Sequence, residues 1–340
     1  MLESKNSFAF QFEQRIEKIM KELISEAPEQ LRDYLQVSKE FVMNSGKRLR
    51  PTVLLYSYLG YGGEKMEDAI TLAAIVEIMH NFLLIHDDVI DESVLRRGKP
   101  TVHMAIGNML RDEKLGKDIA IVVGDILFFH CMRYLNSLSV DASTFRNLIS
   151  AFSKCYSLTG FGQLLDIIYS GHVHEEVINS EIPKEICRLK TAYYTFSYPM
   201  VFGYLLAGGR DSKEESKIIE FGEKIGIAFQ YRDDIYGVFG GERKSINDIQ
   251  EGKFTALLQI ALKSLPEGRA EIIELINKKK KLPEEVDRII KYIRESGALQ
   301  KIQKEIELMI EEGLNLLDQL ELAREYKEKV RDLVKRIAEI

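Results

Sequence analysis

Two groups of aspartates, far apart in the chain, have the residue type and spacing of metal-binding sites. The first group, Asp87, Asp88 and Asp91, lies in the segment HDDVID. In a helix Asp87 and Asp91 are one turn apart on one face, where like charges cost roughly a few tenths of a kcal/mol. A divalent cation would offset this repulsion, and magnesium needs few protein ligands because water and substrate phosphates complete its octahedron. We predict a magnesium site here, the alternative being a solvated acidic helix end.

The second group, Asp233 and Asp234, lies in the segment FQYRDDIYG. Like the first group, it ends an apolar segment with helical spacing, and Asp166 in GQLLD is a third acid that could join them. Acids at the polar ends of several helices can converge in the cavity of a helical bundle. We expect such a cavity to hold several magnesium ions, which an anionic ligand would balance.

Basic residues accompany these acids along the chain. Arginine suits bidentate contact with phosphate, and lysine supplies a mobile point charge. Each residue alone could be a surface charge, but their joint placement predicts a phosphorylated ligand. The candidates are Lys47, Arg50, Arg96, Arg97, Lys190 with its neighbour Thr191, Lys244 and Lys253.

Helices must position these residues. Apolar residues recur at helical spacing between Phe8 and Leu23 and between Ile302 and Leu317, whereas strand-like alternation is scarce and no Asn-Gly or Asp-Gly hairpin signal occurs. No linker or change of composition divides the 340 residues. We predict an all-α protein, a single domain over residues 1–340, with roughly ten or more helices around a central cavity. The run INKKKKLPEE, 276–285, is predicted to be a solvated turn.

Composition excludes several classes of protein. A net charge of -6 argues against nucleic acid as the main partner. The three cysteines are widely spaced, which excludes a disulfide scaffold and a zinc ribbon and fits a reducing cytosol. The most apolar run, 119–132, is too short to span a bilayer and is predicted to be a buried core helix. We predict a cytoplasmic protein without a signal peptide or membrane anchor.

The ordered series of motifs resembles that of the trans-isoprenyl diphosphate synthases, or polyprenyl synthetases. A DDxxD alone is common, whereas the whole series is specific and extends over nearly the entire chain. It comprises GKRLRP (46–51), HDDVIDESVLRRGKPTVH (86–103), GD (124–125), GQLLD (162–166), KTA (190–192), FQYRDD (229–234) and DIQEGK (248–253). The resemblance implies the type I isoprenoid synthase fold and a homodimer. It also implies condensation of isopentenyl diphosphate with dimethylallyl, geranyl or farnesyl diphosphate to a linear all-trans product.

The resemblance implies roles for the candidate residues. Asp87, Asp91 and Asp166 would bind two magnesium ions on the allylic diphosphate, and Asp233 would bind a third, with Asp234 close behind and Asp88 in the catalytic set. The allylic diphosphate would be bound by Arg96, Lys190 and Lys253, and isopentenyl diphosphate by Lys47, Arg50, His80 and Arg97. Thr191 and Gln230 would face the reacting carbons, and Lys244 would close the site.

The implied chemistry accounts for this set of residues. Breaking the allylic C–O bond would give a carbocation and a diphosphate anion, and metal ions with Lys and Arg would stabilise the anion. The double bond of isopentenyl diphosphate would then attack, and the departing diphosphate would take the proton. No Ser, Cys or His nucleophile is needed.

The second motif departs from the family pattern at two places. Gly237 stands where a third aspartate often lies, which is expected to weaken the outer part of the metal site without abolishing activity. The segment from Gly240 to Lys244 is short, and Arg243-Lys244-Ser245 replaces the usual Gly-Lys-Pro.

In this family, the residues before the first motif form the floor of the pocket for the growing chain. Phe82 and Leu83 are fifth and fourth before Asp87, and five residues of helix span about 7.5 Å. One aromatic followed by Leu predicts the C20 product, geranylgeranyl diphosphate, with C15 as the alternative. Phe82 could also simply fill the core.

Two other classes of protein remain as alternatives. A class I terpene cyclase shares the helices and the metal but lacks a second diphosphate site, so the basic set Lys47, Arg50 and Arg97 opposes it. A non-catalytic partner subunit is opposed by the intact first motif.

Overall fold

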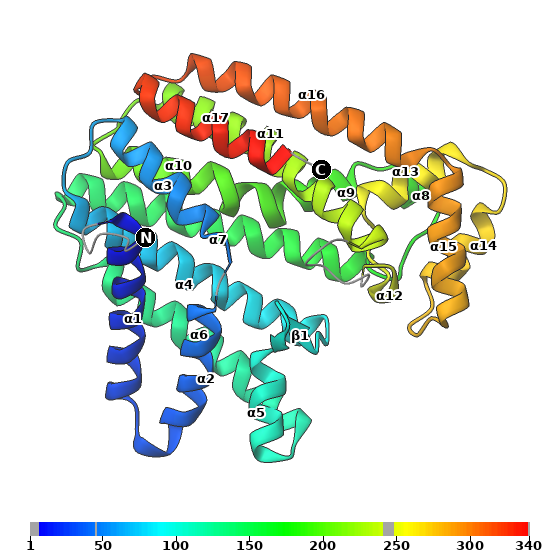
Figure 1. Ribbon diagram of the computed structural model, residues 1–340, viewed down its shortest axis with the longest axis horizontal. Coiled ribbons are helices and arrows are strands. Elements are labelled where there is room, and N and C mark those ends of the chain that lie inside the picture. The colour runs from blue at the N-terminus through cyan, green and yellow to red at the C-terminus, as the bar shows by residue number, and fades with distance from the viewer. Residues whose placement is uncertain (1–6, 45, 241–247, 339–340) are drawn as a thin grey trace. The chain divides into compact units, whose positions relative to one another are not determined.

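The protein is helical throughout the described part of the chain (Figure 1), which in the computed structural model comprises residues 7–44, 46–240 and 248–338. Apart from one short hairpin, every regular element there is a helix, so the all-α prediction is confirmed. The fold divides into two compact units, residues 1–147 with 206–208, and residues 148–205 with 209–340. The central cavity stays a prediction.

The first unit is built around one apolar helix, α4 (Met66–Ile90), which packs against α1, α3 and α6. By length and composition α4 could cross a membrane, but 83% of its apolar window is buried, as in the core helix of a folded protein. The other elements are α1 (Phe8–Glu26), η1 (Glu29–Leu31), α2 (Arg32–Met43), α3 (Leu49–Gly60), β1 (Leu95–Arg96), β2 (Lys99–Pro100), α5 (Val102–Leu110) and α6 (Glu113–Leu135).

The apolar run 119–132 forms part of α6, but the expectation that it is a buried core helix is wrong for one of its faces. Ala120, Val123 and Leu127 are buried, whereas Val122 and Phe129 are 56% and 67% exposed. The apolar composition of the run hid this division, because both faces of α6 are apolar.

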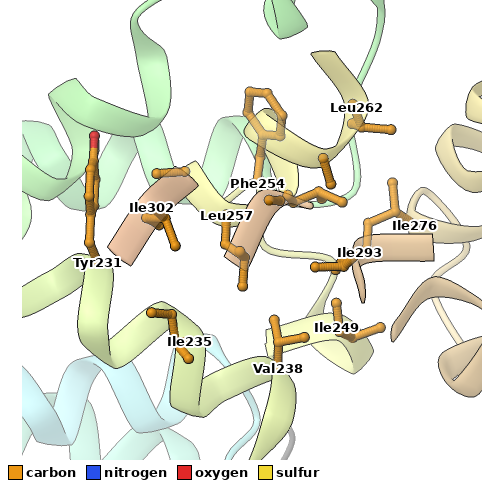
Figure 2. Close-up of a cluster of buried hydrophobic side chains, with 14 of the residues drawn as sticks. Tyr231, Ile235, Val238, Ile249, Phe254, Leu257, Leu262, Ile276, Ile293 and Ile302 are labelled. Atoms are coloured by element: carbon orange, nitrogen blue, oxygen red, sulfur yellow. The ribbon is translucent and has the colours of Figure 1, made fainter. Parts of the chain in front are cut away.

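The second unit is organised around the long helix α11 (Ser212–Phe239), which packs against η2 and α16. A buried cluster joins Tyr231, Ile235 and Val238 of α11 to side chains of the later helices (Figure 2). The other elements are α7 (Ala142–Tyr169, which begins in the first unit), α8 (Glu175–Ile178), α9 (Ile182–Ile186), η2 (Cys187–Ser197), α10 (Tyr198–Leu206), α12 (Asp248–Glu251), α13 (Ala256–Ser264), α14 (Arg269–Ile276), α15 (Pro283–Glu295), α16 (Ala298–Gln319) and α17 (Arg324–Ala338).

The segment η2 is a π-helix, a form that is rare and frequent at functional sites. Glycines let it approach its neighbours backbone to backbone. A Cβ at Gly162 of α7 would lie 2.3 Å from the backbone nitrogen of Lys190, and a Cβ at Gly226 of α11 would lie 2.4 Å from the Cα of Ala192. These close crossings fix the segment that carries Lys190 and Thr191.

Substitution of Gly162 tests this packing. Gly162→Ala is expected to lower the free energy of unfolding by about 1–3 kcal/mol, because a backbone rather than a flexible side chain must move. It should also lower prenyl transfer, since Lys190 would shift. Gly160→Ala is the matched control two residues away, where a Cβ would meet nothing within 4 Å. Equal effects of the two variants on denaturant midpoints would contradict the prediction.

Candidate active site

The first acidic motif lies at the end of α4, with the predicted helical geometry. The Asp91 nitrogen donates to the Asp87 carbonyl at 2.8 Å, so the two residues are one turn apart. Both side chains are partly exposed, whereas Asp88 between them is fully buried. Asp87 and Asp91 are therefore the members of the motif that a ligand can reach.

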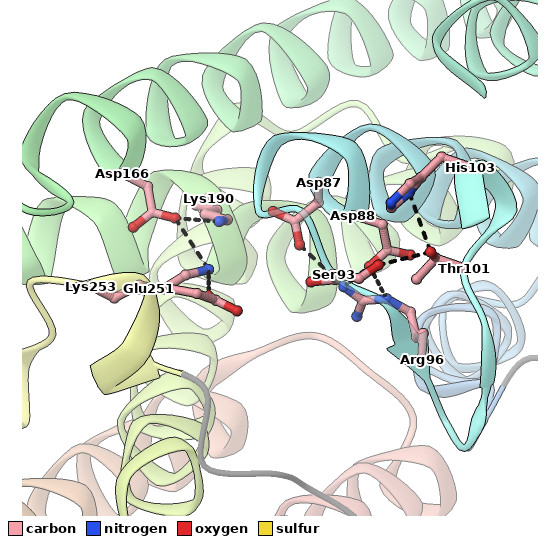
Figure 3. A network of polar contacts seen from close by, with 10 residues as sticks. All are labelled: Asp87, Asp88, Ser93, Arg96, Thr101, His103, Asp166, Lys190, Glu251 and Lys253. Carbon is pink, nitrogen blue, oxygen red and sulfur yellow. Dashed lines mark hydrogen bonds and ion pairs between the residues drawn. The ribbon is translucent and has the colours of Figure 1, made fainter. Parts of the chain in front are cut away.

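Asp88 holds an arginine in place (Figure 3). Arg96 Nη2 lies 2.6 Å from Asp88 Oδ1 and 3.4 Å from Asp87 Oδ2. Burial raises the pKa of Asp88 to about 6, although the charge of Arg96 opposes this shift. The arrangement orients the Arg96 guanidinium beside the Asp87 carboxylate.

Arg96 belongs to a β-hairpin that was not predicted from the sequence. Strands β1 and β2 pair Leu95 with Pro100 and Arg96 with Lys99. The turn residues Arg97 and Gly98 have φ values of 53° and 75°, as a two-residue type I′ turn requires. Gly98 is the sequence signal for this turn, although Arg-Gly is not one of the Asn-Gly or Asp-Gly pairs typical of type I′ hairpins.

A cluster of positive charge surrounds His80 on α4. His80 is 7% exposed, and burial together with the charges of Arg50, Arg97, Arg96 and Arg48 lowers its pKa well below the ordinary value. Its ring is thus neutral at physiological pH. Lys47 is exposed and Arg50 is half-buried. The structure therefore brings Arg50, His80 and Arg97 together.

Buried histidines make the stability of the protein depend on pH. The pKa values of His80, His103 and His130 are all lowered, chiefly by burial. Below their unfolded pKa of about 6.5, the unfolded chain binds more protons than the folded one, so stability is lost as the pH falls. We expect the contribution of these histidines to the free energy of unfolding to decrease between about pH 7.5 and about pH 5.5, whereas Asp88, whose pKa is raised to about 6, contributes the opposite trend. The decrease should be smaller in His80→Gln, and equal decreases in both proteins would contradict this cause.

Phe82 is part of an aromatic stack within the first unit. Its ring centroid lies 5.7 Å from that of Phe128 on α6 and 5.0 Å from that of His86. A Cβ at Gly124 would lie 2.3 Å from His86 Nε2, and Asp125 Oδ1 lies 3.7 Å from the same nitrogen. The Gly-Asp pair thus supports the stack, in which Phe82 is half-buried, as is the adjacent Leu83.

In the second unit, Asp166 is paired with both predicted lysines (Figure 3). Lys190 Nζ lies 2.5 Å and Lys253 Nζ 3.9 Å from Asp166 Oδ2, and Lys253 also pairs with Glu251 at 3.2 Å. Asp166 is 8% exposed. An acid and two cations from three separate segments therefore meet at one point.

The second acidic motif is joined to Thr191 by a short chain of hydrogen bonds. Thr191 Oγ1 donates to Gln230 Oε1 at 2.7 Å, and Gln230 Nε2 donates to Asp234 Oδ1 at 2.9 Å. Asp234 is buried and Asp233 is half-buried, so Asp233 is the more accessible acid. Lys244 lies outside the described residues.

Asp248 occupies the space next to Gly237. A Cβ at Gly237 would lie 1.7 Å from Asp248 Oδ2, so any side chain at 237 would have to displace this carboxylate. Residue 237 of α11 has no side chain of its own, and the carboxylate beside it is that of Asp248. The DIQEGK segment belongs to the family series of motifs, but no role was predicted for its aspartate.

Lys281 is a second residue whose position was not predicted from the sequence. Its neighbours in 278–280 are exposed as predicted for a solvated turn, but Lys281 is 7% exposed, which corrects that prediction. Its Nζ donates to the Gln250 and Lys278 carbonyls at 3.3 and 2.8 Å. It thereby supports the segment that presents Lys253.

The acidic side chains fit a hard divalent cation. Carboxylate oxygens are the ligands that magnesium prefers, and it binds through one or two of them. The described residues contain no group of three or more His, Cys, Asp or Glu side chains arranged to hold a metal. The nearby Arg96, Lys190 and Lys253 could pair with phosphate instead of carboxylate once metal binds the acids.

Comparison with known proteins identifies the family. The polyprenyl synthetase family model matches residues 32–293. Geranylgeranyl diphosphate synthase of Saccharolobus solfataricus is 34% identical over 73% of each chain. Geranylfarnesyl diphosphate synthase of Aeropyrum pernix is 31% identical over 83% of this chain and 86% of its own. The crystal structure of geranylgeranyl pyrophosphate synthase from Corynebacterium glutamicum, complexed with isoprenyl diphosphate and magnesium, has a TM-score of 0.87 at 31% identity, covering 97% of this chain and 98% of its own.

The helical fold is that of a type I isoprenoid synthase. The chain belongs to the polyprenyl synthetase family, and it is a trans-prenyltransferase that acts on isoprenyl diphosphates. The predictions of family, fold class and enzyme class are confirmed. Membership also implies a divalent metal.

Proposed function

We propose that this protein condenses isopentenyl diphosphate with allylic diphosphates and releases geranylgeranyl diphosphate, the C20 product. The observation that carries the proposal is the pairing of acids with cations in both units: Asp87 and Asp88 with Arg96, and Asp166 with Lys190 and Lys253. Acids and cations placed together in this way suit a metal-bound diphosphate, because the metal binds the carboxylates and the diphosphate oxygens pair with the cationic side chains.

Each side chain has a part in this proposal. Asp87, Asp91, Asp166 and Asp233 would hold the magnesium ions, three for each active site, which supply positive charge next to the leaving diphosphate. Arg96, Lys190 and Lys253 bind the allylic diphosphate, and Asp88 positions Arg96. Lys47, Arg50, His80 and Arg97 bind isopentenyl diphosphate, and Lys244 closes the site.

Thr191 and Gln230 are proposed to face the reacting carbons. Gln230 is fixed at both ends, by the Thr191 hydroxyl and by Asp234. Fixed dipoles can stabilise a carbocation without the reorganisation that water would need. Asp234 therefore acts by positioning Gln230, and the attack by the double bond requires no nucleophilic side chain.

We propose that Phe82 and Leu83 set the length of the product. The contacts of Phe82 with Phe128 and His86 hold its ring about one and a half helical turns before Asp87, where it would stop the growing tail. C15 is the alternative product. The named relatives include a geranylgeranyl and a geranylfarnesyl diphosphate synthase, so the family contains enzymes whose products differ in length.

We also propose a cytoplasmic homodimer in which residues 1–340 form one domain. Val122 and Phe129 of α6 are exposed in the single chain, and large exposed apolar patches typically mark an interface with another protein. A second copy of the chain is the proposed partner. Light scattering should give twice the mass of 39.1 kDa, and a monomer would contradict this.

The test is incubation of the protein with magnesium, labelled isopentenyl diphosphate and each allylic primer, with the product sized by chromatography. A linear C20 diphosphate is expected, and chelation of the metal should abolish its formation. A cyclic hydrocarbon would favour the terpene cyclase. No turnover with dimethylallyl, geranyl or farnesyl diphosphate would favour the non-catalytic subunit.

A further inference from the structure

Arg48 has an unusual backbone conformation at the centre of the GKRLRP segment. It lies between Lys47 and Arg50 and caps the start of α3 with φ 49° and ψ 41°. Residues other than glycine rarely adopt this left-handed region, and they do so where surrounding contacts hold them. The direction in which the chain leaves Lys47 and enters the helix of Arg50 depends on this one residue.

The side chain of Arg48 supplies the contacts that hold it. Its Nη1 lies 2.8 Å from Glu77 Oε1 on α4 and donates to the Val42 carbonyl at 3.1 Å. Its Nε and Nη2 donate to the two oxygens of Glu13 on α1 at 2.9 and 3.0 Å. One guanidinium thus ties the segment to α1, α2 and α4.

The two acidic partners differ in burial. The side chain of Glu77 is 2% exposed, whereas that of Glu13 is 40% exposed. A buried carboxylate depends on its ionic partner far more than an exposed one does. Glu77 also lies one turn before His80 on α4, so the pair connects the GKRLRP segment to the helix face that carries His80.

We propose that Arg48 and Glu77 are a positioning pair for the isopentenyl diphosphate site, and that Arg48 itself does not touch the substrate. The guanidinium is committed to Glu77, Glu13 and the Val42 carbonyl, and it fixes Lys47 and Arg50 relative to His80. This inference rests on the proposed function, which assigns these three residues to the second diphosphate.

The experiment measures isopentenyl diphosphate binding by calorimetry without allylic substrate, and the KM of each substrate in turnover. Arg48→Gly keeps the left-handed backbone easily accessible but removes the contacts, and Glu77→Gln keeps the shape but removes the charge. Both should weaken isopentenyl diphosphate binding about tenfold and raise its KM similarly, while the allylic KM changes less than about twofold. Arg48→Lys, which restores a charge opposite Glu77, should recover part of the affinity. Glu13→Gln should weaken isopentenyl diphosphate binding less than Glu77→Gln does, because the side chain of Glu13 is 40% exposed and that of Glu77 is 2% exposed.

Unchanged affinity in Arg48→Gly, equal changes in both KM values, or loss of the folded circular dichroism spectrum in Arg48→Gly would overturn the positioning role. A parent protein whose isopentenyl diphosphate binding depends on this pair but which never turns over would overturn the proposed function alone. A parent that binds no isopentenyl diphosphate would overturn both.

Discussion

Asp87→Asn is expected to lower kcat for prenyl transfer by about 10³-fold, equivalent to about 4 kcal/mol of transition-state stabilisation. The amide keeps the shape of the carboxylate but loses the charge that binds a divalent cation. The side chain of Asp87 is 19% exposed and 3.4 Å from Arg96, so the exchange leaves the fully buried Asp88 pair untouched. Steady-state kinetics over a range of magnesium concentrations would measure the effect.

The control for this variant is Asp118→Asn on α6. Asp118 is an exposed acid that pairs with Lys114 at 2.6 Å, one helical turn away. Its exchange should leave kcat within about twofold, since exposed helical pairs contribute little. An Asp87→Asn protein that retains more than about a tenth of the parental kcat at saturating magnesium would remove the metal role from the first motif.

Phe82→Ala is expected to change the main product from C20 to C25 or longer. The substitution removes the ring that packs between His86 and Phe128 and deepens the space available to the growing tail. Each added isoprene unit contributes five carbons, so the change appears as a discrete step in chromatography of the dephosphorylated products. The double variant with Phe128→Ala should lengthen the product further, because Phe128 is the next ring on α6.

Phe8→Ala on α1 is the control for loss of an aromatic ring elsewhere. Phe8 stacks on Phe12 within α1, with centroids 5.7 Å apart, whereas Phe82 and Phe128 lie on α4 and α6. Its product should remain C20. An unchanged product from Phe82→Ala would assign Phe82 to the core, the alternative that the sequence left open.

Helical periodicity and ordered motifs predicted the features that depend on local sequence. Asp87 and Asp91 are one turn apart because the helix repeat is fixed. Composition did not predict which side chains are buried where burial depends on the packing of neighbouring helices. The two apolar faces of α6 look alike in sequence, although only one is covered.

The remaining misses concern contacts between distant residues. Burial of Lys281 depends on carbonyls around residue 250, and the position of Asp248 depends on the missing side chain at Gly237. Arg48 looks in sequence like one more phosphate-binding cation, and only its contact with the buried Glu77 distinguishes it. The contacts of Lys281 with Gln250 and of Arg48 with Glu77 join residues 31 and 29 positions apart, beyond the reach of periodicity.

The most direct test of the central claim is a crystal structure of the protein with manganese and a non-reactive thio analogue of farnesyl diphosphate, using anomalous scattering to locate the ions. We predict ions bound by Asp87 and Asp91 and by Asp233, all contacting the diphosphate of one analogue molecule, with Arg96, Lys190 and Lys253 on its oxygens. An analogue bound with no anomalous peak at either acidic motif would contradict the account.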